Sequence, residues 1–524
     1  MILVPARGGS IHEGVVGFPR YINPVLAVTD SDKDITSLVY AGLLRQSPQG
    51  ELMPDLAQSF SLSSDSKTYT FTLKPHLKFS DGSPLSADDV LYTIQQIQNP
   101  TIKSPRFANW NGVTIAKIDD QTITFTLIQP YSPFLENMTI GILPKHIWQN
   151  TSADSFALNS LNINPTGEGP YTIKSVKKNS NGVPDSYELK ANSAYNSDKP
   201  QIETITFNFY SSEKDLETGY QNSEIDSMNS VSPNVAKSLE RSGTKIYTAS
   251  LPRVFGVFFN QTDNPALSAI EVRQALDMSV NRDYIVSTVL QSYGTSLMGP
   301  VPERFIGKTP TATSTSYEAL VGKANALLDK AGWVTNADGI REKKLKNGTT
   351  TLAFAISTSD AQELKDVADI LKSEWRKIGV SIDIKVFEGG NLNQSVIRPR
   401  KYDALLFGQI VNRDLDLYAF WHSTQKTDPG LNIALYTNPK ADKLLETLRT
   451  ESNKEDRVTT YNQFQDILTK DVPAVFLYSP DFIYVASPDV KNIVIDNLST
   501  PSERFNGISS WYIDTERVWK IFAH

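Results

Sequence analysis

The sequence predicts an α/β fold that is divided between two or three lobes. Its 524 residues exceed what a single hydrophobic core normally supports, which indicates more than one lobe. Residues 352–386 follow the order strand, helix, strand with short joins, which is typical of a parallel βαβ unit. Residues 52–164 instead have the pattern of a small α+β region.

The βαβ unit is defined by a change in the spacing of its apolar residues. Both outer segments alternate every second residue, as half-buried strands do, and the segment between them has helical spacing and stops at Gly379. The first strand carries Leu352, Phe354 and Ile356, the helix Leu364, Val367, Ile370, Leu371, Trp375 and Ile378, and the second strand Val380, Ile382, Ile384 and Val386. In open parallel sheets, ligands bind beyond the carboxyl ends of the strands.

Residues 402–436 contain another predicted strand whose carboxyl end could lie beside a ligand. The apolar run ALLF reaches Gly408, which is followed by the polar sequence QIVNRDLD and then by an aromatic cluster. The cluster contains Tyr418, Phe420, Trp421 and His422. Such a strand end is a candidate wall of a ligand cleft, and it is also typical of an ordinary strand-to-helix turn.

Three alternating aspartates precede an apolar run near the N-terminus. An EF-hand calcium loop is excluded, because Ile35 stands where a glycine is needed and Ala41 replaces the final glutamate. The pattern predicts a capped helix instead. The aspartates are Asp30, Asp32 and Asp34, and the apolar face of the helix is Ile35, Leu38, Val39 and Leu43.

The α+β region contains two alternating strands and a capped helix between them. Ser86 and Asp89 form a capping-box-like helix start. The strands carry Tyr69, Phe71 and Leu73, then Ile123, Phe125 and Leu127. Further helices are expected over 270–290, 317–331, 438–450 and 454–470, a strand in PAVFLYS, and turns at Asp338-Gly339 and Asn347-Gly348.

Composition and charge exclude several function classes. The net charge is −7 and the chain has no Lys/Arg cluster, which argues against a nucleic-acid partner. The absence of cysteine excludes disulfides, thiolate metal sites and cysteine nucleophiles. The initial apolar run MILV is too short for a signal peptide, and no later stretch is long enough to cross a bilayer. The protein is therefore expected to be cytosolic, or to be a form from which an export signal is missing.

No pattern indicates an enzyme, a metal site or a cofactor. The five histidines, at positions 12, 76, 146, 422 and 524, form no HExxH motif and no i, i+4 pair, and there is no G-x-S-x-G sequence. Carboxylate pairs such as Asp414 and Asp416 fit a solvated surface or a helix cap as well as acid–base catalysis. We expect His422 to be packed or hydrogen-bonded beside Trp421.

Several segments together resemble one protein family, the family 5 extracellular solute-binding proteins of ABC transporters, which includes oligopeptide-, dipeptide- and nickel-binding members. The matching segments lie in order and cover nearly the whole chain. They are INPVLAVTDSDKDITSLVYAGLL, LKFSDGSPLSADDVLYTI, ILPKHIW, GEGPYTI, FFNQTDNPALSAIEVRQALDMSVNRDYI, ALLDKAGW with DGIRE, residues 402–436, and YNQFQDILTKDVPAVFLY.

The resemblance implies a type II periplasmic-binding-protein fold, with two α/β lobes joined by a hinge and an extra α+β domain. The first lobe would combine residues 1–47, 165–258 and 479–524. The extra domain would be 48–164 and the second lobe 259–478. In this family the ligand is enclosed between the lobes by hinge closure and delivered to a membrane permease. The resemblance also implies an exported periplasmic protein or lipoprotein.

In peptide-binding members the ligand lies as an extended strand, and its amino group meets an aspartate a few residues after a glycine. Here Asn412 stands at that position, and Asn carries no charge to hold an ammonium group. Arg413 would repel one, whereas Asp414 could substitute if the loop is shifted. The resemblance thus implies a ligand-binding segment made of Gly408, Gln409, Ile410, Val411, Asn412, Arg413 and Asp414.

The other ligand-binding residues that the resemblance implies are spread along the chain. Asp30 or Asp32 would be either a helix cap or a partner for a ligand cation. Trp110 and Tyr478 would be ligand contacts or plain core residues, and Trp421 would be a ligand contact. Outside residues 408–414, the ligand-binding residues that the resemblance implies are Thr29, Asp30, Ser31, Asp32, Trp110, Trp421 and Tyr478.

The sequence therefore predicts a solute-binding protein that captures a peptide and delivers it to the permease subunits of an ABC importer. Backbone hydrogen bonding would give loose side-chain preference. A non-peptide ligand, such as a glycan, an opine-like compound or a metal chelate, is the alternative. From another class, a surface hydrolase or a chaperone on this scaffold is a further alternative, but an enzyme would need a nucleophile–base pair in the cleft, which the sequence does not show. We expect a monomer that acts outside the cytoplasm.

Overall fold

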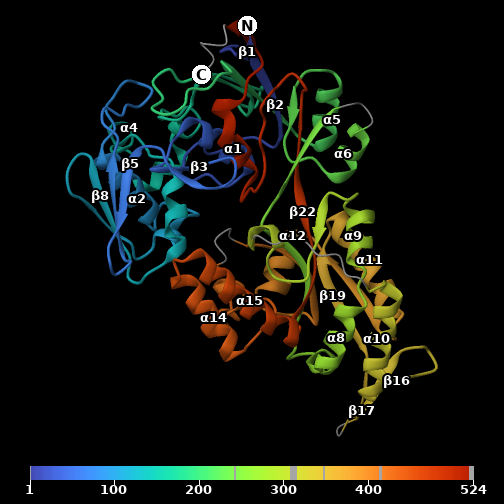
Figure 1. The fold of residues 1–524 in the computed structure, drawn as a ribbon. Coiled ribbons are helices and arrows are strands. Elements are labelled where there is room, and N and C mark those ends of the chain that lie inside the picture. Colours follow the sequence, from blue (N-terminus) through green and yellow to red (C-terminus); the bar gives the residue numbers. More distant parts are fainter. Residues whose placement is uncertain (1, 241–243, 307–314, 346–347, 412–415, 519–524) are drawn as a thin grey trace. The chain divides into compact units, whose positions relative to one another are not determined.

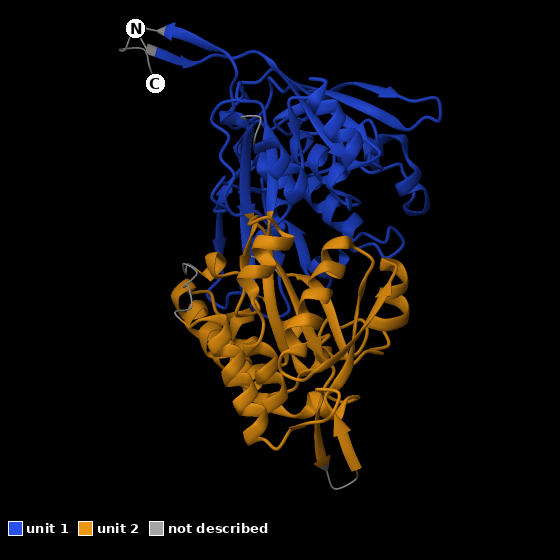
Figure 2. Cartoon of the chain, turned by 90° about the vertical axis from the view of Figure 1, so that its right-hand side faces the viewer, with its two compact units in different colours: residues 1–249, 482–524 blue, residues 250–481 orange. Residues whose placement is uncertain are grey.

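The chain divides into two compact units in the computed structural model. The structure describes residues 2–240, 244–306, 315–345, 348–411 and 416–518. Unit 1 comprises residues 1–249 and 482–524, and unit 2 comprises residues 250–481 (Figure 2). The predicted α+β domain, 48–164, falls inside unit 1, and its independence as a third domain stays a prediction.

Unit 1 is built on a mixed sheet in which two parallel strands lie side by side. The order is β22-β12-β2-β11-β10-β9, of which β2 and β22 are labelled in Figure 1. β11 runs parallel to β2, with Tyr210 opposite Val16. The strands are β2 Ser10–Val16, β9 Tyr171–Lys178, β10 Pro184–Ala191, β11 Thr204–Tyr210, β12 Ser227–Met228 and the last residues of β22 Ala474–Ala486. β13 Lys245–Ser250 pairs with β22, and β1 Ile2–Pro5 pairs with β23 Thr515–Val518.

A second, four-stranded antiparallel sheet in unit 1 has the order β5-β6-β8-β7. Buried and half-buried residues alternate along β6, which confirms the predicted strand pattern at Tyr69, Phe71 and Leu73. α2 Ala87–Gln98 packs against this sheet. The strands are β5 Ala57–Leu62, β6 Thr68–Leu73, β7 Thr114–Lys117 and β8 Thr122–Thr126, with a separate hairpin of β3 Leu44–Gln46 and β4 Leu52–Pro54.

Two helices of unit 1, α1 and α2, begin at caps that the sequence predicts. Ser86 and Asp89 form a complete capping box at the start of α2, and Thr29 and Asp32 form another at the start of α1 Asp30–Val39. The remaining helices are α3 Phe107–Trp110, α4 Lys145–Trp148, α5 Glu213–Gln221 and α6 Pro233–Glu240, with the 3₁₀ turns η1 Ser132–Thr139, η2 Ala153–Leu158, η3 Ser160–Asn162 and η7 Pro501–Ser510.

Unit 2 is built on a sheet that contains the predicted parallel βαβ unit. The order is β20-β19-β21-β14-β22, with β15 also beside β22. β19 and β20 are parallel and are joined by α11 Gln362–Arg376, which confirms the βαβ prediction. The strands are β14 Arg253–Phe259, β15 Gly294–Ser296, β19 Ala353–Ser359, β20 Ser381–Phe387 and β21 Ala404–Ile410; β16 Val334–Thr335, β17 Arg341–Leu345 and β18 Gly348–Thr351 form a separate sheet.

Helices cover both faces of the unit 2 sheet, so the sheet separates two hydrophobic clusters. Along β14, Val257 and Phe259 belong to one cluster, and Val254 and Phe258 belong to the other. The helices are α7 Pro265–Ser268, α8 Ile270–Met278, α9 Arg282–Val289, α10 Tyr317–Lys330, α12 Gly389–Asn391, α13 Tyr418–Trp421, α14 Pro439–Thr450 and α15 Lys454–Asp471, with η4 Glu303–Ile306, the π-helix η5 Leu392–Ile397 and η6 Ser423–Gln425.

Two predicted elements of unit 2 differ from the structure in their bounds. The helix expected over 270–290 is two helices: α8 ends at Met278 with Ser279 as its C-cap, and Asn281 caps α9 by accepting from the backbone N–H of Tyr284. The strand expected to stop at Gly408 continues to Ile410. The turn at Asp338-Gly339 is confirmed by the positive φ of Gly339, whereas Asn347 lies outside the described residues.

Candidate functional site

The carboxyl end of β21 has an open edge. β19 pairs with β21 only at Ile356 and Ser357, opposite Ala404 and Leu405. Beyond that point the two strands separate, and only the Thr358 hydroxyl still reaches β21, donating a 3.0 Å hydrogen bond to the Leu406 carbonyl. No strand among the described residues pairs with that edge of β21 from residue 407 to residue 410.

The register of β21 shows which backbone groups lie on the open edge. On the β14 side, the Asn260 N–H donates to the Asp403 carbonyl at 2.8 Å, and the Val411 N–H donates to the Pro252 carbonyl at 2.7 Å. In an antiparallel pair, hydrogen-bonding positions alternate, so the odd-numbered residues of β21 bond to β14. The N–H and C=O groups of Gly408 and Ile410 therefore point toward the open edge. The side chain of Ile410 is 62% exposed there.

A row of residues crosses three strands next to this edge. Tyr478 of β22 lies opposite Phe255 of β14, and Phe255 lies opposite Gly408 of β21. The Phe255 and Tyr478 rings are stacked, with centroids 5.1 Å apart and an interplanar angle of 8°. A Cβ atom on Gly408 would lie 2.7 Å from the Phe255 ring, closer than carbon atoms can pack. Glycine at this position therefore leaves room for the stacked pair beside the open edge.

Glu363 lies over the same row. It is in the first turn of α11, which begins three residues after the end of β19, and its Oε1 accepts a 2.7 Å hydrogen bond from the Tyr478 hydroxyl. In the sheet order, β21 and β14 separate β19 from β22. The start of α11 and the Glu363 side chain together therefore reach over the face that carries Gly408 and Phe255 as far as Tyr478.

Burial and one distant cation set the electrostatics of Glu363. Burial raises the pKa of its carboxyl, while the Tyr478 hydrogen bond and the positive charge of Arg253 oppose that shift. Arg253 begins β14 directly opposite Ile410, so its side chain lies on the face that carries Phe255 and Gly408. The site thus contains an acidic and a basic side chain beside an open strand edge.

The segment that follows β21 is only partly described. Val411 is buried, and Asn412, Arg413 and Asp414 lie outside the described residues, so their predicted roles stay predictions. The description resumes at Asp416, whose carboxylate lies 3.4 Å from Nε of Arg449 and accepts from the backbone N–H of Tyr418 at the start of α13. Gln409, also in the predicted segment, is buried, and its amide donates to the Leu431 carbonyl at 3.4 Å.

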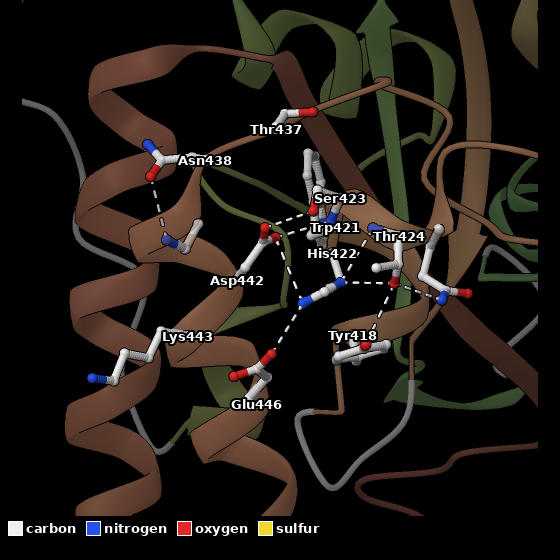
Figure 3. Close-up of polar contacts among 12 residues, drawn as sticks. Tyr418, Trp421, His422, Ser423, Thr424, Thr437, Asn438, Asp442, Lys443 and Glu446 are labelled. Carbon is white, nitrogen blue, oxygen red and sulfur yellow. Dashed lines mark hydrogen bonds and ion pairs between the residues drawn. The ribbon is translucent and has the colours of Figure 1, made fainter.

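His422, at the end of α13, contacts side chains of both α13 and α14 (Figure 3). Its ring stacks on Tyr418 with centroids 4.1 Å apart, and its Nδ1 lies 2.8 Å from the Thr424 hydroxyl. Its Nε2 points toward α14, 3.5 Å from a carboxylate oxygen of Glu446 and 3.9 Å from one of Asp442. The backbone N–H of Thr424 donates to Nδ1, so the second nitrogen carries the proton in the neutral ring. These contacts give His422 the packed role that the sequence predicts.

Trp421 and Trp110 are both core residues in this structure. Trp421 is fully buried against Phe258 and Phe476. Trp110 is 1% exposed and packs against Phe125 and Phe134 beside the small sheet of unit 1. Trp110 therefore occupies a core position, the alternative to ligand contact, and Trp421, expected as a ligand contact, is equally enclosed. A ligand would reach either ring only if the neighbouring side chains moved.

The predicted residues of unit 1, 29–32, lie at the start of α1. The Asp32 carboxylate accepts four backbone hydrogen bonds, from residues 20, 21, 28 and 29, so Asp32 is a helix cap with no free oxygen. Ser31 is buried. Thr29 is exposed and Asp30 is partly exposed, so these two remain able to meet a ligand.

Exposed apolar residues gather near the same end of unit 1. The parallel strands β2 and β11 end together at Val16 and Tyr210, and the backbone N–H of Gly17 donates to the Tyr210 carbonyl. The apolar side chains exposed around this strand end and the start of α1 are Val16, Phe18 and Val28. In both units, therefore, apolar side chains are left in solvent at a carboxyl strand end, where α/β proteins bind ligands.

Some features of the site could not be read from the sequence. Glu363, Arg253 and Phe255 were not predicted, because only the sheet order brings these distant residues to Gly408 and Tyr478. The acidic residue at the start of α11 was the one available signal in the sequence, and an acidic residue there is also typical of any helix N-terminus.

Within the described parts of the chain, no group of three acidic or histidine side chains is arranged to hold a metal ion. In those same parts, no helix has the length and apolar character required to cross a bilayer.

Comparisons with known proteins agree with the predicted fold. The profile of the bacterial extracellular solute-binding proteins, family 5, matches residues 51–431. The oligopeptide-binding protein AppA of Bacillus subtilis (strain 168) is 26% identical over 484 residues, which cover 91% of this chain and 87% of AppA. The structure of AppA from Bacillus subtilis in complex with a nonapeptide has a TM-score of 0.73 at 26% identity, over 98% of this chain and 100% of that one.

A second solved structure holds a different ligand. NikZ from Campylobacter jejuni in complex with Ni(L-His) has a TM-score of 0.75 at 28% identity, over 96% of this chain and 99% of NikZ. The two likenesses confirm the type II periplasmic-binding fold that the sequence predicts. Because the family profile matches well over half of its residues, the chain belongs to the bacterial extracellular solute-binding proteins of family 5.

Proposed function

We propose that this protein binds a peptide outside the cytoplasm and delivers it to the permease of an ABC importer, acting as a monomer and without catalysis. The observation that carries the proposal is the open edge of β21 at Gly408 and Ile410. An extended peptide can add to such an edge as a further strand, because its backbone supplies the missing donors and acceptors. The stacked rings of Phe255 and Tyr478 lie beside that position.

The relatives support a peptide ligand. AppA of Bacillus subtilis is named as oligopeptide-binding, and its structure holds a nonapeptide. A chain from Helicobacter pylori of the same fold is described as an ABC transporter-associated binding protein in complex with a peptide. Backbone pairing leaves the ligand's side chains free, so we expect binding of many sequences rather than one.

A metal chelate is the second candidate ligand. NikZ, which is as similar to this chain as AppA is, holds nickel through histidine. A chelate has no extended backbone, so it could not add to the edge of β21 as a further strand. The two candidates therefore differ in whether the groups of Gly408 and Ile410 are used.

The test is the identification of bound and binding molecules. Mass spectrometry of whatever co-purifies with the protein comes first, followed by thermal denaturation with peptide pools, sugars and nickel–histidine. A ligand at about 100 times its Kd stabilises the folded state by about 2.7 kcal/mol, which shifts the melting temperature measurably. We expect a shift with peptides. A shift with sugars or with nickel–histidine and none with any peptide would refute the peptide proposal.

A further inference from the structure

We propose that Glu363 pairs with a cationic nitrogen of the bound peptide and thereby gives this protein a preference for ligands with a free ammonium group. The proposal rests on the proposed function, since it assigns a role within the same site. It does not depend on residues 412–415, in which the sequence predicts a different anchor. The ammonium group could be the peptide's amino terminus or a lysine side chain, and the experiment separates the two.

The position of Glu363 is the first argument. Its carboxylate extends from the start of α11 to Tyr478, across the face that carries Phe255 and Gly408. Gly408 is the residue whose backbone groups lie on the open edge. A peptide strand added at that edge would extend the sheet by one strand, and its side chains on this face would lie on the same side of the sheet as the Glu363 carboxylate.

The hydrogen bonds of Glu363 are the second argument. Tyr478 donates to Oε1, which fixes the orientation of the carboxylate, while no described residue donates a hydrogen bond to Oε2. Oε2 is not among the fully enclosed atoms of the described residues that lack a partner, so it keeps access to solvent. A carboxylate with one oriented and one accessible oxygen is able to accept an N⁺–H donor.

The charge balance around Glu363 is the third argument. Arg253 is the one cation that acts on the carboxyl, and no ion pair within 4 Å joins the two side chains in the described structure. A partly buried carboxylate without a close cation is costly to keep ionised. A ligand ammonium would supply the missing positive charge, which favours ligands that carry one.

A purely structural role for Glu363 is the competing explanation. An acidic side chain in the first turn of a 15-residue helix stabilises that helix by interaction with its dipole. This explanation predicts lower stability on removal of the charge and no change in the preference among ligands. The two explanations therefore differ in the ratio of the affinities for ligands with and without an ammonium group, which can be measured.

The experiment compares ligand pairs by isothermal titration calorimetry. The first pair is penta-alanine and N-acetyl-penta-alanine, and the second is N-acetyl-Ala-Ala-Lys-Ala-Ala-amide and the same peptide with norleucine in place of lysine. We expect the wild-type protein to prefer the ammonium-bearing member of one pair by about tenfold, in keeping with one charge-assisted hydrogen bond. The pair that shows the preference identifies the ammonium group that Glu363 meets.

Glu363→Gln keeps the shape of the side chain and removes its charge. We expect this variant to bind both members of each pair within about twofold. The wild-type preference should also decline as the pH falls and the carboxyl is protonated, and the variant should show no such dependence. Asp369→Asn is the matched control, because it removes a charge from an exposed position of the same helix and should leave the ratio unchanged.

Each result decides the matter. If the wild-type protein binds peptides but prefers neither ammonium-bearing member, or if Glu363→Gln keeps the preference, Glu363 does not hold the ligand cation and the proposed function stands. If the wild-type protein binds no peptide at all, the proposed function fails, and the assignment of Glu363 fails with it.

Discussion

The hydroxyl of Tyr478 donates a 2.7 Å hydrogen bond to Oε1 of Glu363 and so joins a strand of the unit 2 sheet to the first turn of the helix that crosses it. Tyr478 also stacks on Phe255, which leaves no room for a side chain at residue 408. A glycine, two rings and a carboxylate thus form one connected group beside an unpaired strand edge.

Tyr478→Phe removes the hydroxyl and nothing else from this group. Glu363 then loses a donor while staying partly buried, so its pKa should rise further above the ordinary value, because the hydrogen bond that opposes the shift is gone. We expect the free energy of unfolding to fall by about 1–2 kcal/mol, the cost of leaving a buried polar group without a partner. Chemical denaturation measures this change. An unchanged stability would mean that the hydroxyl–carboxylate bond is not formed in solution.

Gly408→Ala should disturb the stacked rings. The new methyl carbon would lie 2.7 Å from the Phe255 ring, so either the ring or β21 must move. We expect a loss of about 1–3 kcal/mol in stability, as overpacking usually costs, together with weaker peptide binding. Denaturation and calorimetry give the two quantities.

Gly322→Ala is the control for that substitution. Gly322 lies inside α10, no atom lies within 4 Å of the place that an added methyl carbon would take, and its φ is not in the left-handed region. Alanine there should stabilise the helix by up to about 1 kcal/mol and leave peptide binding unchanged. Equal loss of binding in both variants would contradict a local effect at Gly408.

Asp32→Ala and Asp30→Ala should have different effects, although the two carboxylates are neighbours. Asp32 accepts four backbone hydrogen bonds, so its removal should cost about 2 kcal/mol or more of stability. Asp30 contributes mainly through the helix dipole, so its removal should cost about 0.3–1 kcal/mol. Thermal denaturation compares them, and an equal cost for the two variants would contradict the cap.

Arg504 forms the centre of a buried charge cluster in unit 1. Its guanidinium, fully buried, donates to both carboxylate oxygens of Asp34 at 2.7–2.8 Å and to Glu13 at 2.7 Å, and the Tyr484 hydroxyl donates to Glu13. Arg504→Met would leave two carboxylates buried without a cation. We expect a loss of about 3–5 kcal/mol. Arg517→Met, at an exposed position, is the control and should cost little.

The stability loss in Arg504→Met should depend on pH. Burial raises the pKa of Asp34 to about 6 from its ordinary 3.8, and Arg504 opposes that rise. The native state therefore holds this proton more tightly than the unfolded chain does, and the contribution of Asp34 is present below its ordinary pKa and is lost as the pH rises through about 6. Without Arg504 the pKa rises further. The variant should thus be more destabilised at neutral pH than in weak acid, and a constant difference would contradict the cluster.

The sequence predicts local structure well where one periodicity dominates. The alternation at Tyr69, Phe71 and Leu73 and the strand–helix–strand order of 352–386 both appear in the structure, because a buried face imposes its period on the residues. The capping box at Thr29 and Asp32 is likewise local. The break between Met278 and Arg282 was missed, because both helices place apolar residues at compatible spacings and only residues 279–281 separate them.

Contacts between distant residues could not be predicted. Arg504 and Glu13 are 491 positions apart, and Tyr478 and Glu363 are 115 apart, so nothing local in the sequence pairs them. Their pairing follows from the sheet order, which the single sequence does not specify. The open edge of β21 has the same origin, since it depends on β19 separating from β21 after Ser357.

The most direct test of peptide addition to β21 is amide hydrogen exchange, resolved by residue with NMR, in the free and peptide-saturated protein. The amides of Gly408 and Ile410 face the open edge, whereas those of Phe407 and Gln409 already bond to β14. We predict that peptide binding slows exchange at Gly408 and Ile410 and changes it little at Phe407 and Gln409. Saturation by a peptide that raises the melting temperature but leaves exchange at Gly408 and Ile410 unchanged would contradict the account.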